Sequence, residues 1–373
     1  MSIHFHKLAI TDVRKETADC ITVAFDLPEA IKPLFIYEAG QNITVRTILN
    51  NEEIRRSYSI CSCPHEKELR IAIKEATGGK FSTWANKEFV KGQILEVLPP
   101  TGRFNIHLND FHRKRYLAIA AGSGITPILP IISTALRNEP LSSFTLLYGN
   151  RNRASIIFRD QLNSMKNRYM HRFALHHVLS QEEPDATIYS GRIDAGKCEA
   201  LSLHLVDFTA MDEIFICGPG KMIFGLKDWL ISNGVADKKI HYELFTIPVE
   251  ETISNDVSRP KDLTKPKDLI VDVPSAGTSQ LSNITIRLDG LSFDFKLSPD
   301  GESVLEAALA LGADLPFSCK GGVCSTCRAK LIEGKVRMEL NYALEPGELE
   351  AGYILTCQSH PLTEKVVIDF DQK

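Results

Sequence analysis

The chain has 373 residues, 43% of them hydrophobic and 24% charged, a composition typical of globular proteins and a length that predicts two or three domains. The formal net charge of −4, without a basic run interleaved with aromatic residues, argues against nucleic acid as a partner. The N-terminus lacks a signal-peptide pattern and no stretch approaches about eighteen uninterrupted apolar residues, so we expect a cytoplasmic protein without a membrane partner.

Closely spaced short strands predict an antiparallel β-barrel over residues 1–111. β-branched and aromatic residues mark strands at 21–25, 43–46, 69–74 and 94–98. Glycine-containing breaks at 78–79 and 91–92 separate the later strands, and little helical periodicity lies between the strands. This pattern is typical of an antiparallel barrel.

A further barrel strand, at 55–60, carries a candidate flavin site. A flavin needs a flat partner for its ring, a hydrogen-bond partner near N5 and a cation at its phosphates, which Tyr58, Ser59 and Arg56 can supply in that order. At Gly79 and Ser82, small residues let backbone N–H groups approach a pyrophosphate. Taken alone, the short R-x-Y-S match is better explained by an exposed arginine beside a core tyrosine.

The pattern changes after residue 111, and residues 112–246 predict an α/β domain with a parallel sheet. Continuous apolar runs occur at 116–121, 144–148 and 213–217, each followed by a glycine turn. A helical stretch from 128 to 136 follows the first of them. Strands that are buried on both faces and alternate with helices are typical of a parallel sheet.

The first glycine turn of this domain is a candidate site for a nicotinamide nucleotide. Gly122 and Gly124 follow a strand and precede a helix, so a pyrophosphate can lie over the helix N-terminus. The spacing departs from the full G-x-G-x-x-G fingerprint, because Pro127 stands in the third glycine position. Arg151 and Arg153 end the next strand and favour a 2′-phosphate, hence NADPH over NADH. A solvated turn with two surface arginines is nearly as good an explanation.

These motifs together resemble the ferredoxin–NADP reductase superfamily over about residues 1–246. The resemblance rests on the R-x-Y-S motif, its spacing to Gly79 and Ser82, and the G-x-G-x-T-P form of the glycine turn. It implies FAD, although an FMN-binding variant of the family exists. It also implies that Thr126 faces the nicotinamide. The FAD contacts it implies are Arg56, Tyr58, Ser59, Gly79 and Ser82.

The resemblance extends to the end of the α/β domain. Cys217-Gly218-Pro219 matches the C-G-P signature of the superfamily, which implies that Cys217 lies where hydride passes between nicotinamide and flavin. A buried cysteine that only packs is the alternative. Glu243 and Phe245 match the end of the reductase module, where an acid can orient the nicotinamide and an aromatic ring can cover the flavin. The predicted catalytic residues are Cys217, Ser59 and Glu243.

Residues 247–281 have the proline, lysine, glycine and serine content of a linker, and residues 282–373 predict a third domain. Strands at 283–287 and 293–297 form a predicted hairpin around Asp289-Gly290. Ser303 opens an alanine-rich helix with a capping-box pattern.

Four cysteines of the third domain have the spacing of a plant-type [2Fe–2S] cluster, C-x4-C-x2-C followed by a distant fourth. They are Cys319, Cys324, Cys327 and Cys357. Zinc also accepts four thiolates, but structural zinc sites usually pair two C-x2-4-C knuckles. A disulfide framework conflicts with the other evidence against secretion. The domain resembles plant-type ferredoxins, which implies an α+β fold of the β-grasp type.

Together the three domains predict an electron-transfer oxidoreductase. NADPH, or alternatively NADH, would reduce FAD, which accepts two electrons together and passes them singly to the cluster. The order of domains resembles that of oxygenase reductases such as those of phenylacetyl-CoA epoxidases, and this implies a di-iron oxygenase partner. Two alternatives stay open: another acceptor, such as a hybrid-cluster protein or a desaturase, or a non-enzymatic iron–sulfur redox sensor.

Several residues suited to metal or redox chemistry carry no predicted role. The histidines have no metal-binding spacing, and the side chains of His176 and His177 should point to opposite faces of a strand. Cys61 and Cys63 form a C-x-C pair that is explained by packing, although a redox pair is the alternative.

Overall fold

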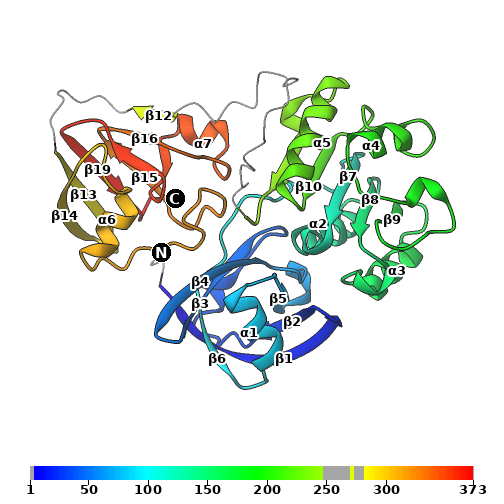
Figure 1. The fold of residues 1–373 in the computed structure, drawn as a ribbon, viewed down its shortest axis with the longest axis horizontal. Helices are drawn as coiled ribbons and strands as arrows, with labels where there is room; N and C mark the ends of the chain where they lie inside the picture. Colours follow the sequence, from blue (N-terminus) through cyan, green and yellow to red (C-terminus); the bar gives the residue numbers. More distant parts are fainter. Residues whose placement is uncertain (1–3, 247–268, 273–280, 373) are drawn as a thin grey trace. The chain divides into compact units, whose positions relative to one another are not determined.

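The computed structural model describes residues 4–246, 269–272 and 281–372, with the backbone alone described for 269–272. The chain divides into two compact units, Phe5–Phe245 and a second unit of residues 1–4 and 246–373. Figure 1 shows the helices and strands of each unit, coloured along the sequence. Among the described residues, no helix has the length and apolar character needed to cross a bilayer.

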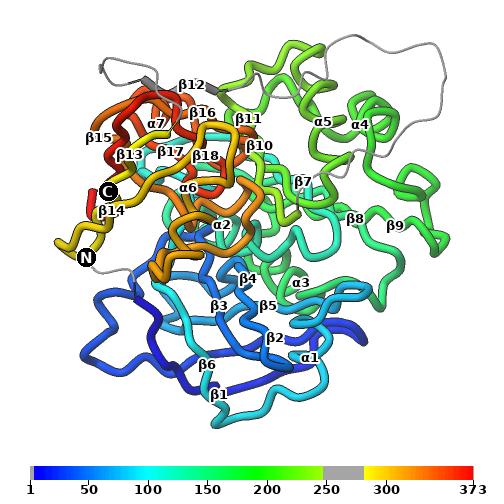
Figure 2. The backbone as a smooth tube through the Cα atoms, turned by 60° about the vertical axis from the view of Figure 1, so that its left-hand side comes forward, coloured from blue at the N-terminus to red at the C-terminus, as the bar shows by residue number. Residues whose placement is uncertain are grey.

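The first unit begins with an antiparallel sheet of six strands in the order β4-β3-β6-β1-β2-β5. A bridge between Ile60 and Ile71 joins the two edges of this sheet, which closes it into a barrel around a common apolar core (Figure 2). The four strands predicted at 21–25, 43–46, 69–74 and 94–98 are confirmed. The elements are β1 (His6–Thr17), β2 (Cys20–Phe25), β3 (Asn42–Leu49), β4 (Glu52–Ser59), β5 (Leu69–Lys74), α1 (Lys80–Glu88) and β6 (Ile94–Val97).

The same unit continues into a five-stranded sheet in which every pairing is parallel. The strand order is β11-β10-β7-β8-β9, so the chain leaves β7 toward one edge of the sheet and later returns to fill the other. The predicted parallel α/β fold is confirmed. The elements are β7 (Arg115–Ala121), α2 (Ile125–Asn138), β8 (Ser143–Asn150), α3 (Arg159–Arg168), β9 (Phe173–Leu179), α4 (Ala195–Ser202), β10 (Glu213–Cys217), α5 (Gly220–Ser232) and β11 (Ile240–Glu243).

Helix α2 begins three residues earlier than the predicted 128, at Ile125. Pro127 therefore lies inside its first turn. Proline is tolerated there because the first N–H groups of a helix have no intrahelical acceptor. The sequence prediction treated this proline as a boundary, although in the structure it belongs to the helix.

The second unit contains a five-stranded mixed sheet in the order β14-β13-β19-β15-β17. Asp289 and Gly290 both have positive φ, as a two-residue hairpin turn requires, so the predicted hairpin is confirmed. The Ser303 hydroxyl accepts from Glu306 N–H and caps helix α6 as predicted. The elements are β13 (Ser282–Leu288), β14 (Leu291–Leu297), α6 (Val304–Ala310), β15 (Arg328–Glu333), α7 (Pro346–Glu350), β17 (Tyr353–Leu355) and β19 (Lys365–Asp369).

A three-stranded sheet completes this unit, and one of its strands falls in the predicted linker. Strand β12 (Leu269–Asp272) pairs antiparallel with β16 (Lys335–Met338), which also pairs with β18 (Ser359–Pro361). The sequence predicted no strand there. Four residues cannot fold alone, but β16 supplies the hydrogen-bonding partner that a strand needs. The rest of that stretch, 247–268 and 273–280, lies outside the described residues, and the domain boundaries stay predictions.

Candidate hydride-transfer and cluster sites

The predicted nicotinamide site lies where the parallel sheet changes direction. Strands β7 and β10 are neighbours, and their connections leave toward opposite edges, which is the place where open α/β sheets bind ligands. A side chain on Gly124 would begin only 2.0 Å from the carbonyl oxygen of Cys217. The glycine turn after β7 therefore packs directly on the end of β10, and only glycine fits at this contact.

The glycine turn is shaped for a phosphate group. Gly122 has a φ of 54°, and its carbonyl oxygen accepts a hydrogen bond of 2.9 Å from the Tyr148 hydroxyl. Gly124 precedes α2 and gives it no side-chain cap, but the N–H of Ile125, the first residue of α2, already donates to the carbonyl oxygens of Gly122 and Ser123. An anion at this turn would therefore bind the other N–H groups at the start of the helix. Thr126, predicted to face the nicotinamide, is buried in this first turn.

One charged residue that the local sequence did not indicate, Lys74, also reaches this turn, and Asp19 pairs with it. The Lys74 ammonium group lies 3.8 Å from the point where a side chain on Gly122 would begin. The carboxylate oxygen Oδ2 of Asp19 lies 3.7 Å from the Lys74 ammonium nitrogen and 2.7 Å from a guanidinium nitrogen of Arg151. Lys74 ends barrel strand β5, and nothing in its neighbouring residues indicates that it meets a glycine turn from the other sheet.

The three predicted catalytic residues are brought together from two sheets. Cys217 and Glu243 are register partners at the carboxyl ends of β10 and β11. Ser59, at the end of barrel strand β4, donates a hydrogen bond of 3.0 Å to Glu243 Oε2. Residues from three strands therefore form one cluster, although nothing in the local sequence links Ser59 to the other two. Their roles stay predictions.

Burial controls the protonation of this cluster. It raises the pKa of Glu243 to about 8, against a smaller opposing effect of the Ser59 hydrogen bond. The side chain therefore carries its proton at neutral pH and can donate a hydrogen bond to a ligand. Burial, followed by the charge of Glu243, also holds the pKa of Cys217 well above its ordinary value. Cys217 is thus an unreactive thiol, as a residue beside a reacting ring should be.

The predicted flavin contacts divide between the two faces of β4. Arg56 is exposed and Tyr58 is half-buried against Phe81, with ring centroids 5.7 Å apart. Alternation along the strand places these two on one face and turns Ser59 to the other. One guanidinium nitrogen of Arg56 binds the Arg55 carbonyl oxygen, which leaves other donors of the fork for a phosphate.

The glycine loop before α1 fits a pyrophosphate. A side chain on Gly79 would begin 2.5 Å from Ser82 Oγ, so glycine is required, and Gly79 gives α1 no side-chain cap. The Ser82 hydroxyl accepts from Ala76 N–H at 3.0 Å. Ser82 therefore shapes the loop itself, in addition to its predicted contact. Phe245, predicted to cover the flavin, follows β11 and is 40% exposed.

Arg151 and Arg153, predicted to favour a 2′-phosphate, both have acidic partners. Arg151 binds Asp19, and Arg153 lies 3.3 Å from Glu182 and 3.7 Å from Asp185. Exposed pairs of this kind are worth about 0–1 kcal/mol each. A doubly charged phosphate can therefore compete for either arginine, and the pairing alone does not decide between NADPH and NADH.

The four predicted cluster ligands converge in the second unit as two touching pairs. A hydrogen bond from the Cys324 thiol is the main cause that lowers the pKa of Cys319 to about 6. A hydrogen bond from Cys327 likewise lowers the pKa of Cys357. One member of each pair is thus ready to be a thiolate, which is the form that binds iron.

Backbone N–H groups surround these sulfur atoms. Gly321 N–H donates to Cys319 Sγ at 3.3 Å, and the Gly322 N–H group reaches Cys357. Lys320, Gly322 and Ser325 have positive φ, which folds the loop so that its N–H groups point inward. Four converging thiols inside a shell of donors fit a [2Fe–2S] cluster.

The two hydroxyl side chains of the loop, Ser325 and Thr326, have different partners. The Thr326 hydroxyl donates to Cys324. Ser325 instead donates to the Ala343 carbonyl oxygen at 3.3 Å. Gln358 was not singled out from the sequence, yet its amide lies 3.7 Å from Cys357 Sγ.

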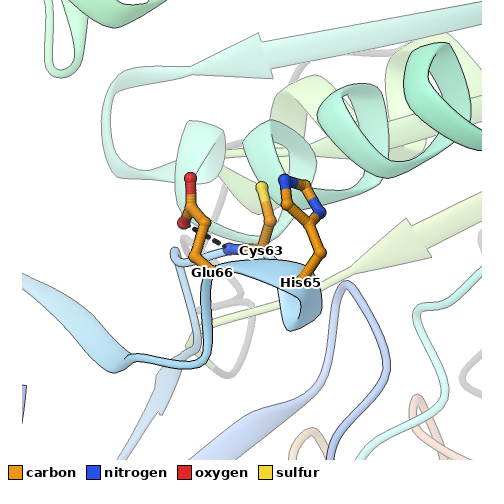
Figure 3. Close-up of side chains that lie close together, drawn as sticks. All are labelled: Cys63, His65 and Glu66. Atoms are coloured by element: carbon orange, nitrogen blue, oxygen red, sulfur yellow. Dashed lines mark hydrogen bonds between the residues drawn. The ribbon is translucent and has the colours of Figure 1, made fainter.

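Apart from the four cluster cysteines, one further group among the described residues contains residue types that can bind a metal ion, but local structure explains why its members lie together. Cys63, His65 and Glu66 point from the same side of one short turn (Figure 3), with their ligand atoms within 4.8 Å of one another. Glu66 N–H binds the Cys63 side chain, and the Glu66 carboxylate accepts from Cys63 N–H at 2.8 Å, which is a capping box. Burial and then the charge of Arg137 lower the pKa of His65, and that same charge opposes a cation. We interpret the group as a structural cap.

Comparison with known proteins agrees with this geometry. Three family models match the chain, an oxidoreductase FAD-binding domain at 7–106, an oxidoreductase NAD-binding domain at 118–228 and a 2Fe-2S iron-sulfur cluster binding domain at 286–362. One subunit of the 1,2-phenylacetyl-CoA epoxidase of Escherichia coli K12 is 43% identical over 99% of this chain and 98% of its own. The chain belongs to the modular NAD(P)H oxidoreductases that carry FAD and a [2Fe–2S] cluster.

Other members of this family share its full length. The "3-ketosteroid-9-alpha-monooxygenase, ferredoxin reductase component" of Rhodococcus rhodochrous is 31% identical, over 97% of this chain and 96% of its own. The solved structure of phthalate dioxygenase reductase has a TM-score of 0.54 at 23% identity and covers 98% of both chains, so the fold is shared. The predicted superfamily, the three-domain fold class and the cofactors FAD, [2Fe–2S] and nicotinamide nucleotide are confirmed.

Proposed function

We propose that this oxidoreductase is the reductase component of an oxygenase that epoxidises a CoA thioester of the phenylacetyl type. The observation that carries the proposal is the 43% identity with the epoxidase component of Escherichia coli, which extends over nearly the whole of both chains. The acceptor would be a di-iron oxygenase component. Plant-type clusters have potentials of about −400 mV, low enough to supply such a centre.

The residues of the first unit support a hydride-transfer step. When bound, FAD accepts two electrons together and releases them singly, which a one-electron cluster requires. Gly124 lets the glycine turn approach Cys217, whose small neutral side chain leaves room for the nicotinamide ring. Glu243 keeps a proton with which it can hold the carboxamide, and Ser59 orients Glu243 from the barrel side.

We infer NADPH as the coenzyme, because Arg151 and Arg153 are placed after β8, where the adenosine ribose lies in open α/β sheets. Loss of either guanidinium group by substitution with alanine should raise the KM for NADPH more than that for NADH. Equal kcat/KM values for the two coenzymes in the wild-type protein would contradict this inference. We also place the protein in the cytoplasm, where nicotinamide nucleotides occur and thiols stay reduced, so that four of the nine cysteines can bind iron and none needs to form a disulfide.

The test is reconstitution with the remaining components of a phenylacetyl-CoA epoxidase. NADPH, phenylacetyl-CoA and the reductase should together give rapid oxygen consumption and an epoxide detected by mass spectrometry. The Cys357→Ser variant is the control, since it retains the flavin half of the protein. An oxygen-consumption rate unaffected by the epoxidase components would contradict the proposal.

A second candidate is an oxygenase with a different substrate, because reductases of ketosteroid and glycine betaine monooxygenases also match the whole chain. Their identities of 31% and 30% are lower than 43%, which is why the epoxidase is preferred. Faster turnover with a ketosteroid monooxygenase component than with the epoxidase would favour this second candidate. If the protein were a non-enzymatic iron–sulfur sensor, NADPH would not reduce a dye rapidly through it, whichever oxygenase component is added.

A further inference from the structure

The residue that follows the last cluster ligand has a buried amide directed at the cluster loop. Gln358 is 6% exposed, and its Nε2 donates to the Lys320 carbonyl oxygen at 3.1 Å. The same nitrogen lies 3.0 Å from the Cys357 carbonyl oxygen and 3.7 Å from Cys357 Sγ. One amide therefore connects the fourth ligand to the loop that holds the other three.

The orientation of this amide follows from its neighbours. Two carbonyl oxygens, of Lys320 and Cys357, accept from Nε2, so exchange of the amide oxygen and nitrogen would bring oxygen against oxygen. The donor side of the amide must face these groups and the Cys357 sulfur. Gln358 Cγ also lies 3.3 Å from where a side chain on Gly322 would begin, so the stem packs over a residue whose N–H group binds the same sulfur.

The other end of the amide has no such function. Gln358 Oε1 is buried and has no hydrogen-bond partner among the residues that the structure describes. An unpaired buried acceptor destabilises a protein, and an apolar side chain of the same size would avoid this cost. The amide at this position is therefore explained by what its donor side does.

We propose that Gln358 is a positioning residue for the cluster: its amide holds Cys357 against the 319–327 loop and, by donating to the Cys357 sulfur, raises the reduction potential of the cluster. The donor withdraws negative charge from the thiolate, which stabilises the reduced, more negative state of the cluster. The inference depends on the cluster and not on which oxygenase accepts its electrons.

The experiment compares three variants of the complete, cofactor-loaded protein. Gln358→Met keeps the approximate volume and removes the donor, and Gln358→Glu keeps the shape and places carboxylate oxygens near the sulfur. Gln372→Met is the matched control, since it makes the same change at an exposed residue of the same unit. Iron and acid-labile sulfide per flavin measure cluster content, and a redox titration followed by the EPR signal of the reduced cluster gives the midpoint potential.

We expect the midpoint potential to fall in Gln358→Met and further in Gln358→Glu, while Gln372→Met equals the wild type. The iron–sulfur stretching bands in resonance Raman spectra should move to higher frequency in Gln358→Met, because the Fe–S bond to Cys357 strengthens without its donor. Wild-type potentials in both Gln358 variants with full cluster content would overturn the proposal. Loss of the cluster from both would overturn the role of the amide as a donor to the sulfur, since it would show that Gln358 only holds the loop together.

Discussion

Cys217 in the first unit and Cys319 in the second are the same residue type in opposite surroundings. Burial and the charge of Glu243 hold the pKa of Cys217 well above its ordinary value. The Cys324 thiol and the N–H groups of the loop lower the pKa of Cys319 to about 6. The first cysteine is kept neutral at the place predicted for hydride transfer, whereas the second is prepared to become a thiolate, the form that binds iron.

The difference arises from what surrounds each sulfur. Cys217 ends a strand whose N–H groups are used in the sheet, so few donors remain to stabilise a negative charge. The cluster loop instead has positive φ at Lys320, Gly322 and Ser325, which frees its N–H groups for the sulfurs. Burial at Cys217, and the neighbouring Cys324 thiol followed by backbone N–H donors at Cys319, therefore decide which cysteine can be anionic.

The largest effect is expected from a cluster ligand. Cys324→Ser should abolish reduction of one-electron acceptors, because three thiolates and a hydroxyl hold a [2Fe–2S] cluster poorly. NADPH should still bleach the flavin absorbance, since the first unit has its own core. Cys198→Ser, in α4 of the first unit, is the control and should retain acceptor reduction. Failure of flavin bleaching in Cys324→Ser would show that the two sulfur environments are not independent.

The contact beneath Cys217 gives the next largest effect. Gly124→Ala places a methyl group 2.0 Å from the Cys217 carbonyl oxygen and should destabilise the protein by about 1–3 kcal/mol. NADPH-dependent flavin reduction should slow as well. Gly225→Ala, inside α5 with open space around it, is the matched control and should stabilise by roughly 0.5–1 kcal/mol. Chemical denaturation measures the change in the free energy of unfolding for both variants. Equal changes for Gly124→Ala and Gly225→Ala would contradict the close approach of Gly124 to Cys217.

Cys217 itself should be less critical than a cluster ligand. Cys217→Ala removes a side chain that positions the reacting rings, and we expect flavin reduction to slow on the order of tenfold. Stopped-flow spectroscopy with NADPH measures this rate. Flavin and iron content should equal those of the wild type. A complete loss of flavin reduction would mean that the thiol does more than occupy space.

The remaining effect concerns the pH dependence of stability. The folded protein keeps a proton on Glu243 to about pH 8, whereas the ordinary glutamate pKa is 4.5, so the wild type should lose stability as pH rises through this window. The slope from one such group is at most about 1.4 kcal/mol per pH unit. Glu243→Gln should flatten the curve of Tm against pH, and the exposed Glu88→Gln should not. Identical curves for wild type and Glu243→Gln would contradict a buried, protonated carboxyl.

Much of the architecture follows from local sequence patterns. The barrel strands, the parallel α/β domain and the hairpin at Asp289-Gly290 were predicted because side-chain periodicity and turn chemistry act over a few residues. Helix α2 was predicted too short because Pro127 was treated as a boundary. Strand β12 was missed because its stability comes from β16, far along the chain.

Local sequence patterns were enough to predict the four cluster cysteines, the glycine turns and the order of the three domains, since each depends on spacing within a short segment. The folded chain was needed to show that Ser59 meets Glu243, that Lys74, paired with Asp19, reaches the turn at Gly122, and that Gln358 faces Cys357. These contacts join separate elements, so they depend on strand order and register. Local spacing contains neither, because both arise when distant strands pair and bury their shared core.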